Sequence, residues 1–366
     1  MENRNWNDFR HTVVKTASDE QHSQYCQEFL QPSLSVEVRF TYADEHALIQ
    51  TYKQVLDLLE DSFMYYNGNR IGNREKAFSR FPALIENPKS DFFYNRIADT
   101  ETAGSWAKGK KPAVTGGIGC AEFSYSIIKC TQAKWDKAIA QLGKYAQKGE
   151  TRREPVVSFL NIRIPIETFA DAGSFSDWVL ELEIMKSPSL YSAAAGYYIK
   201  IYDEHTGTEV EDQLEKTLDD HPGFGYDIIS RMQGRYSFDN KIIRPVISRI
   251  SWLNILSDGI FLFCPGGREG FIKSAAEKPE LVLHSLPYGI AVQAGPQPGI
   301  GDNGRAPEAY YSAAEFLEDF TYFIEGRELR DSEFIDWQRH FFTPGMTVKR
   351  QNQAIALAAL YIEQDH

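Results

Sequence analysis

The chain has 366 residues, of which 42% are hydrophobic and 25% charged, proportions that are ordinary for a soluble globular protein. Its 51 acidic and 39 basic residues give a formal net charge of -12. That balance argues against a nucleic-acid binder, which needs lysine and arginine to replace the counterions of the phosphates. It suits a partner protein with a basic surface.

No export or membrane signal is recognisable in the chain. Its first residues lack the continuous apolar core of a signal peptide, and no run of about 18 apolar residues occurs. The cysteines are Cys26, Cys120, Cys130 and Cys264. None forms a CxxC pair, so free thiols in a reducing compartment are favoured over disulfides or a metal site. We therefore expect a cytoplasmic protein that contacts no membrane and holds no cofactor.

The first half of the chain begins with a weakly patterned N-terminal extension over residues 1–33. Apolar and polar residues then alternate from Ser35 to Tyr42, which predicts a half-exposed strand. Asp44 and Glu45 open a helix, where negative charge suits the positive end of the helix dipole. Its core-facing stripe is Leu48, Tyr52, Val55, Leu59 and Phe63.

In the second half, strands and helices follow one another closely. Strands are predicted at Val156 to Ile166, Tyr197 to Ile201, Val246 to Trp252 and Ile260 to Phe263. Helices are predicted at Ser174 to Met185, Thr208 to Leu218 and Gly270 to Lys278. Leu281 to Leu283 is expected to pair with Gly289 to Ala294.

The stretch from Tyr288 to Ile324 is the one around which we expect the rest of the chain to be organised. A short apolar strand leads into a loop, Gly295 to Pro307, with four glycines and three prolines. Such a composition predicts a rigid, tightly turned loop rather than a linker. An amphipathic helix then starts near Pro307, where the missing N–H costs nothing.

These elements predict an α+β fold with mixed, largely antiparallel sheets and flanking helices. The expected organisation is the extension over 1–33, an α+β domain over 34–345 and a C-terminal helix over 346–366. The domain is either one body or two similar strand–helix lobes, 34–150 and 151–345, divided near a charged stretch at 149–154.

Motifs that carry chemistry are mostly missing from the sequence. It has no GxSxG elbow, no HExxH, no P-loop and no EF-hand loop. Two interpretations of Asp302, in a Gly-Asp-Asn-Gly segment, remain open. It is either a catalytic carboxylate or a side chain that hydrogen-bonds within its own turn.

An acidic run between Asp203 and Asp220 holds eight carboxylates against one cation, Lys216. A second acidic run extends from Glu315 to Glu333. Both are explained either as solvated helix faces or as an electrostatic surface for a basic partner. The candidate partner-binding residues are Asp203, Glu204, Glu209, Glu211, Asp212 and Glu215.

Five segments together carry a family resemblance. They are AAAGYYIKI (193–201), HPGFGYDI (221–228), ISRISWLNILSDGIFLFCPGG (247–267), AGPQPGIGDNGRAPEAY (294–310) and DWQRHF (336–341). With them the chain resembles the type VI secretion immunity family, antidotes that bind and block a toxin delivered between bacteria. The resemblance extends from Leu34 to Phe341 and is strongest in the second half.

The resemblance implies a binding scaffold rather than an enzyme, because the shared residues set turns and packing. Those residues are Trp252, Gly266, Gly267, Gly295, Pro298, Gly301, Asp302 and Trp337. The implied function is an immunity protein that binds a cognate toxin one-to-one and occludes it, without a cofactor. The alternatives are a hydrolase that reverses the toxin's damage, with Asp302 in its site, or a structural module of a secretion apparatus.

Overall fold

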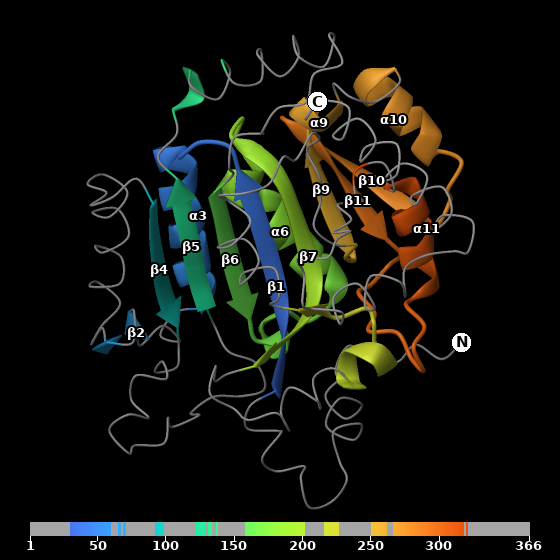
Figure 1. Ribbon diagram of the computed structural model, residues 1–366, viewed down its shortest axis with the longest axis horizontal. Helices are drawn as coiled ribbons and strands as arrows, with labels where there is room; N and C mark the ends of the chain where they lie inside the picture. Colours follow the sequence, from blue (N-terminus) through green and yellow to red (C-terminus); the bar gives the residue numbers. More distant parts are fainter. Residues whose placement is uncertain are drawn as a thin grey trace, which may run out of the picture.

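The computed structural model describes residues 30–59, 65–66, 69–70, 92–98, 122–128, 131–133, 137, 158–201, 216–226, 250–261, 266–317 and 320. Its main feature is one 11-stranded sheet with the strand order β10-β11-β9-β7-β1-β6-β5-β4-β2-β3, and with β8 beside β7 (Figure 1). Every described pairing is antiparallel except that of β7 with β8. The predicted α+β class, largely antiparallel with flanking helices, is confirmed.

The strands are β1 (Leu30–Phe40), β2 (Tyr65–Tyr66), β3 (Asn69–Arg70), β4 (Phe92–Ala98), β5 (Glu122–Ile128), β6 (Ser158–Ile164), β7 (Leu190–Ile201), β8 (Gly225–Tyr226), β9 (Leu253–Ser257), β10 (Leu281–Leu286) and β11 (Gly289–Ala294). The helices are α3 (Glu45–Leu59), α6 (Ala172–Glu181), α9 (Asp258–Phe261), α10 (Gly267–Ala275) and α11 (Glu308–Phe316). Two short 3-10 helices are η3 (Ile166–Thr168) and η4 (Glu183–Lys186).

Strand β1 lies at the centre of the sheet, between β6 and β7. Val36, for example, is opposite Ile162 on one side and Ala195 on the other. The predicted buried face is confirmed, since every second residue of β1 from Leu34 onward is fully buried. The prediction that the strand is half-exposed is wrong, because Ser35 and Thr41 on the opposite face are buried as well. The strand begins at Leu30 rather than Ser35, because its pairing with β7 continues to the end of that strand. The expected end of the N-terminal extension at residue 33 therefore falls inside β1.

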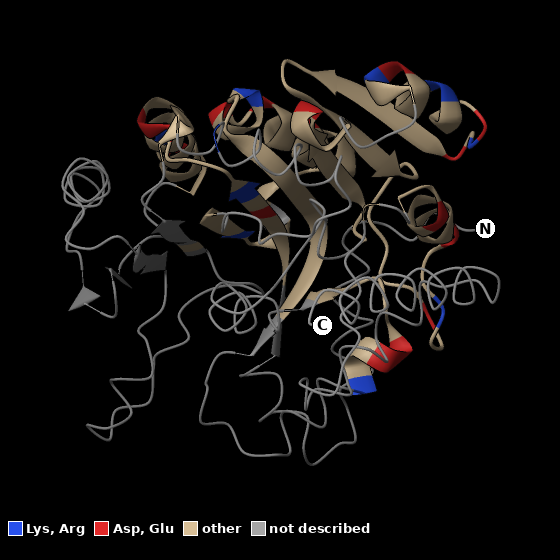
Figure 2. Ribbon diagram, turned by 45° about the horizontal axis from the view of Figure 1, so that its top comes forward, with Lys and Arg blue, Asp and Glu red and all other residues tan. Residues whose placement is uncertain are grey.

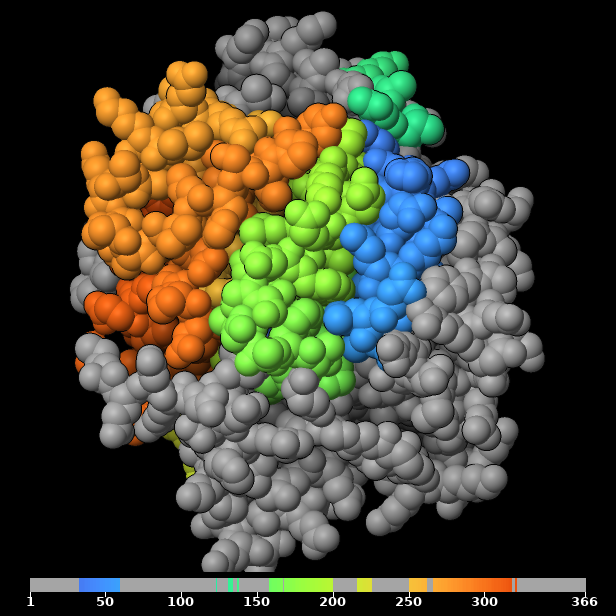
Figure 3. Space-filling view, turned by 180° about the vertical axis from the view of Figure 1, so that it is seen from behind, coloured from blue at the N-terminus to red at the C-terminus, as the bar shows by residue number. Residues whose placement is uncertain are grey.

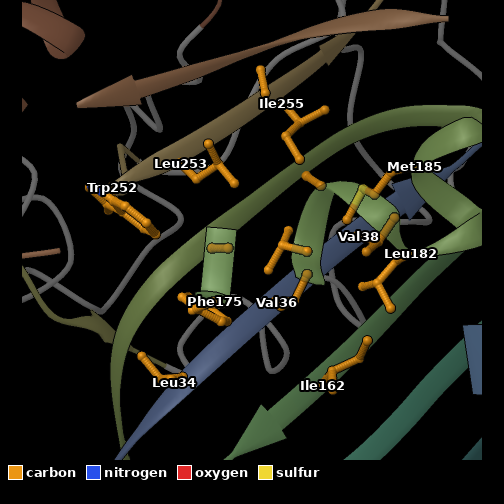
Figure 4. Close-up of a cluster of buried hydrophobic side chains, with 14 of the residues drawn as sticks. Leu34, Val36, Val38, Ile162, Phe175, Leu182, Met185, Trp252, Leu253 and Ile255 are labelled. Carbon is orange, nitrogen blue, oxygen red and sulfur yellow. The ribbon is translucent and has the colours of Figure 1, made fainter. Parts of the chain in front are cut away.

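Helices α3 and α6 cover one face of the sheet (Figures 1 and 3). The predicted stripe of α3 is confirmed over Leu48, Tyr52, Val55 and Leu59, which are all buried, and its last residue, Phe63, lies outside the described residues. Polar bonds tie this helix to the α6–η4 segment: Thr51 Oγ1 accepts the Ile184 N–H at 2.9 Å, and Gln54 bonds two further backbone groups. Figure 4 shows the core that results, with side chains of the strands facing Phe175, Leu182 and Met185.

Helix α6 is shorter than the helix predicted from Ser174 to Met185. It begins after Asp171, whose carboxylate accepts the Ser174 N–H at 2.7 Å. It ends at Glu181, and the chain then turns into η4. The prediction joined two elements because both contribute buried residues at helical spacing, Val179 and Ile184 among them.

The strand predicted at Ile260 to Phe263 is wrong, because residues 258–261 form helix α9. The strand in this part of the chain is β9, which pairs with β7 and with β11 as far as Ser257. A continuous apolar run does not distinguish strand from helix by periodicity. The predicted hairpin is confirmed, with Leu283 opposite Val292.

The predicted division into two lobes remains a prediction. The charged stretch at 149–154 lies outside the described residues. On either side of it the strands share one sheet, since β5 pairs with β6 and β1 lies between β6 and β7. The C-terminal helix predicted over 346–366 also lies outside the described residues. No helix in the described part of the chain is long and apolar enough to cross a membrane.

Candidate functional site

The loop from Gly295 to Pro307 is a tightly folded structure whose backbone requires glycine. Gly295 and Gly301 both have φ of 80°, in the left-handed region that side chains disfavour. A Cβ on Gly301 would lie 2.2 Å from the Arg305 carbonyl oxygen, so no other residue fits there without movement. The rigid turn predicted from the glycines and prolines is therefore what the structure contains.

The segment around His221 packs directly against this loop. The Gly223 N–H donates to the Ile300 carbonyl at 2.7 Å, and the Gly304 N–H donates to the Asp220 carbonyl at 3.1 Å. His221 is buried, with its Nδ1 2.9 Å from the Gly301 carbonyl oxygen. Two of the segments that carry the family resemblance thus form one hydrogen-bonded unit.

Trp252 connects the same loop to the central sheet. Its side chain is fully buried and stacks on Phe175, with ring centroids 6.0 Å apart. Its Nε1–H donates to the Gly295 carbonyl at 3.0 Å, and the Gln293 amide donates to the same oxygen at 2.9 Å. The loop is therefore anchored at its first residue by an aromatic side chain from another resemblance segment.

Helix α11 holds the far end of the loop with two tyrosine hydroxyls. Tyr310 accepts the Gly299 N–H at 3.3 Å, and Tyr311 accepts the Ala306 N–H at 3.0 Å. Burial raises the pKa of Tyr197 well above its ordinary value, with a smaller contribution from neighbouring Tyr310. This phenol therefore stays neutral at physiological pH, which suits a packed core.

Asp302 lies in an exposed turn. Its N–H donates to the Arg305 carbonyl at 2.9 Å, and its carbonyl accepts the Arg305 N–H at 3.0 Å. Within the described ranges, no group of three or more His, Cys, Asp or Glu residues is placed to hold a metal ion. These bonds are made by the backbone of Asp302, so both interpretations of its side chain, as a catalytic carboxylate or as a group bonded within the turn, remain predictions.

Gly266 and Gly267 form the start of helix α10. Both have positive φ, 77° and 62°, and the Gly266 carbonyl accepts the first helical N–H from Gly270 at 3.0 Å. Pro298 is buried in the loop described above. Trp337 lies outside the described residues.

None of the predicted partner-binding carboxylates falls within the described residues. They are Asp203, Glu204, Glu209, Glu211, Asp212 and Glu215. The helix predicted over this run is seen only from Lys216 onward, where Leu218 is buried and Asp219 exposed. Their role as a toxin-binding surface therefore remains a prediction.

The structure also exposes apolar side chains that the sequence analysis did not single out. The large apolar side chains most exposed among the described residues are Ile272, Val282 and Tyr288, at 41%, 47% and 44%. They belong to α10, β10 and the turn between β10 and β11. The sequence predicted β10 as a strand, but its position at the edge of the sheet depends on the strand order, which no local pattern gives.

The comparison with protein families decides the broad identity. A family model described as TsiV, type VI immunity for VRR-NUC, matches residues 121–345. The chain belongs to the TsiV family. The predicted resemblance to type VI immunity proteins is thereby confirmed. The matched range of this TsiV-family chain contains the loop, the Trp252 anchor and the His221 segment.

The fold of this TsiV-family protein is also found in a solved structure. It is similar to the Pseudomonas aeruginosa type VI secretion system (T6SS) protein PA0821, with a TM-score of 0.57 and 15% sequence identity. The similarity covers 90% of this chain and 89% of that chain. At this identity the likeness concerns the fold. The search of curated proteins finds no match.

Proposed function

We propose that this protein protects the producing bacterium by binding a VRR-NUC toxin one-to-one and occluding the toxin's active site. The observation that carries the proposal is the TsiV family match over residues 121–345. In the described part of the chain, the resemblance segments make contacts within the fold, through backbone and aromatic groups. Such contacts suit a rigid scaffold that presents a surface to a partner.

The charge of the chain supports a basic partner. A net charge of -12 attracts a protein with a basic cleft and raises the rate of association. We take the VRR-NUC toxin to act on nucleic acid, which would require such a cleft. On this proposal the immunity protein competes with the nucleic acid for the cleft and performs no chemistry itself.

The decisive experiment is a titration of the purified protein against its cognate VRR-NUC toxin, with the toxin's activity on nucleic acid as the readout. A stoichiometric binder abolishes activity with a sharp break at one equivalent. An antidote enzyme would instead protect at far lower ratios and with a time dependence. Protection well below one equivalent would overturn the binding proposal and favour the hydrolase alternative.

The proposed site of action is the cytoplasm. Cells that express the toxin without an export signal should survive only when the immunity protein is made without one. Protection that appeared only when the immunity protein was directed to the periplasm would contradict this location.

A further inference from the structure

The open end of the sheet lies at β10. Strand β10 pairs with β11 on one side, and no further strand follows it among the described residues. In an antiparallel sheet, alternate residues of an edge strand direct backbone N–H and C=O groups outward. Natural edge strands are protected by charged residues, proline, a bulge, or a helix or loop that covers the edge. Strand β10, with the sequence LVLHSL, has no lysine, arginine, aspartate, glutamate or proline within it.

Helix α10 packs alongside this edge strand and fixes its position. Arg268 at the start of the helix donates to the Leu286 and Gly289 carbonyls, at 3.2 and 3.0 Å, beside the hairpin turn. At the other end, the Leu281 N–H donates to the Lys278 carbonyl at 3.0 Å. The helix and the strand therefore run antiparallel as one rigid unit, and the aromatic ring of Phe271 holds it to the core.

This unit carries the three exposed apolar side chains Ile272, Val282 and Tyr288. We call the exposed part of residues 267–288 the α10–β10 face. Viewed from behind, residues 266–294 reach the surface at one end of the molecule (Figure 3). An edge strand without charged residues, with exposed apolar side chains beside it, is a surface that a partner protein can bind.

The charges around the α10–β10 face indicate which partner fits. Figure 2 shows both signs on α10, but two of the cations are already paired: Arg268 with Asp258 at 2.9 Å, and Lys278 with Glu315. The remaining charged side chains on residues 267–288 are Glu269, Lys273, Glu277 and Glu280. A hydrogen bond from Ser312 lowers the pKa of Glu280, so this carboxylate stays charged. Three carboxylates against one ammonium make the rim acidic.

We propose that the α10–β10 face is the surface that binds the VRR-NUC toxin, an inference that rests on the proposed function. The three apolar side chains form the dry centre of the interface, and the acidic rim contacts basic groups of the toxin. A second copy of this chain fits less well, because each copy would set the same acidic rim against the other.

The test is the affinity of the toxin for the triple variant Ile272→Ser, Val282→Thr and Tyr288→Ser. The three residues are 41–47% exposed, so we expect the variant to stay folded with a modest fall in melting temperature. The dissociation constant should rise by about 30-fold or more, as it does when the central anchors of an interface are removed.

Two further measurements test the same surface independently of the triple variant. Glu277→Lys should weaken toxin binding, whereas Asp177→Lys, an equal charge change at an exposed position on α6, should leave it nearly unchanged. Amide hydrogen exchange of β10 should slow in the wild-type complex, whether or not the variants fold.

The outcomes distinguish failure of the proposed binding surface from failure of the proposed function. If wild type inhibits the toxin while the triple variant binds equally well and β10 gains no protection, the surface proposal is overturned and the proposed function stands. If wild type itself fails to bind the toxin, both fail. A dimer of wild type that the triple variant abolishes, with toxin affinity unchanged, would assign the face to self-association and also overturn the proposal.

Discussion

Replacing Trp252 with alanine should destabilise the whole domain without changing the toxin-binding surface. The side chain is fully buried and stacks on Phe175, so its removal leaves a large cavity between the sheet and α6. Truncations of this kind cost about 3–5 kcal/mol. For a chain of this size, such a loss corresponds to a fall in melting temperature of about 10 °C.

The variant Trp252→Phe distinguishes the effect of the cavity on stability from the effect of the lost hydrogen bond. Phenylalanine fills most of the space but cannot donate to the Gly295 carbonyl. That oxygen still accepts the Gln293 amide at 2.9 Å, so no buried acceptor is left unsatisfied. The cost should then be about 1–2 kcal/mol.

Urea unfolding followed by circular dichroism measures both losses, and toxin titration at low temperature tests the folded fraction. The alanine variant should bind the toxin with wild-type affinity once its unfolded fraction is subtracted. Equal melting of wild type and both variants would refute the assignment of Trp252 as the anchor of the loop. A folded alanine variant with weakened binding would place Trp252 in the interface instead.

Three other perturbations follow from the structure. Gly301→Ala should lower the free energy of unfolding by about 2 kcal/mol or more, because its Cβ would meet the Arg305 carbonyl. Gly267→Ala is the matched control, because its Cβ meets nothing within 4 Å, and it should lower the free energy of unfolding by about 1 kcal/mol in the same assay. The Ser174 N–H lowers the pKa of Asp171, so its stabilisation is present above about pH 4 and lost as the pH falls through the folded-state value. Asp171→Asn should keep the helix cap and flatten this part of the stability–pH profile; an unchanged profile would contradict the assignment. In the acidic run, Glu211, Asp212 and Glu215 are to be changed to lysine. The triple variant should associate with the toxin more slowly than wild type at low salt but not at high salt. Association rates equal to wild type at both salt concentrations would mean that the run is only a solvated surface.

Local patterns in the sequence were sufficient to predict those elements that have one apolar and one polar face. The period of two in β1 and the stripe of α3 each report a buried face, and both are found as predicted. The glycines of the Gly295 to Pro307 loop likewise predicted a tight turn, because positive φ is costly for other residues. Helix α9 was mistaken for a strand because the apolar run from Ile260 to Phe263 is too short to show a period.

Long-range arrangement could not be predicted in the same way. Nothing local to β1 indicates that it pairs with β6 and β7 rather than with the next strand along the chain. The interlock of Gly223 with Ile300, and of Trp252 with Gly295, joins segments whose separate sequences show only turns and apolar residues. The family resemblance found these segments, and the structure gives the physical reason that they occur together.

The same physics explains why the scaffold of an immunity protein is easier to predict than its binding surface. At Gly301 the fold itself dictates the residue, because any side chain would collide with the backbone. At Val282 the fold demands only a strand former, and threonine would serve the sheet equally well. Half of that side chain is nevertheless left in water, at 47% exposure, on an edge with no charge to protect it. The proposed toxin-binding surface therefore depends on residues of this kind, which the fold alone does not specify.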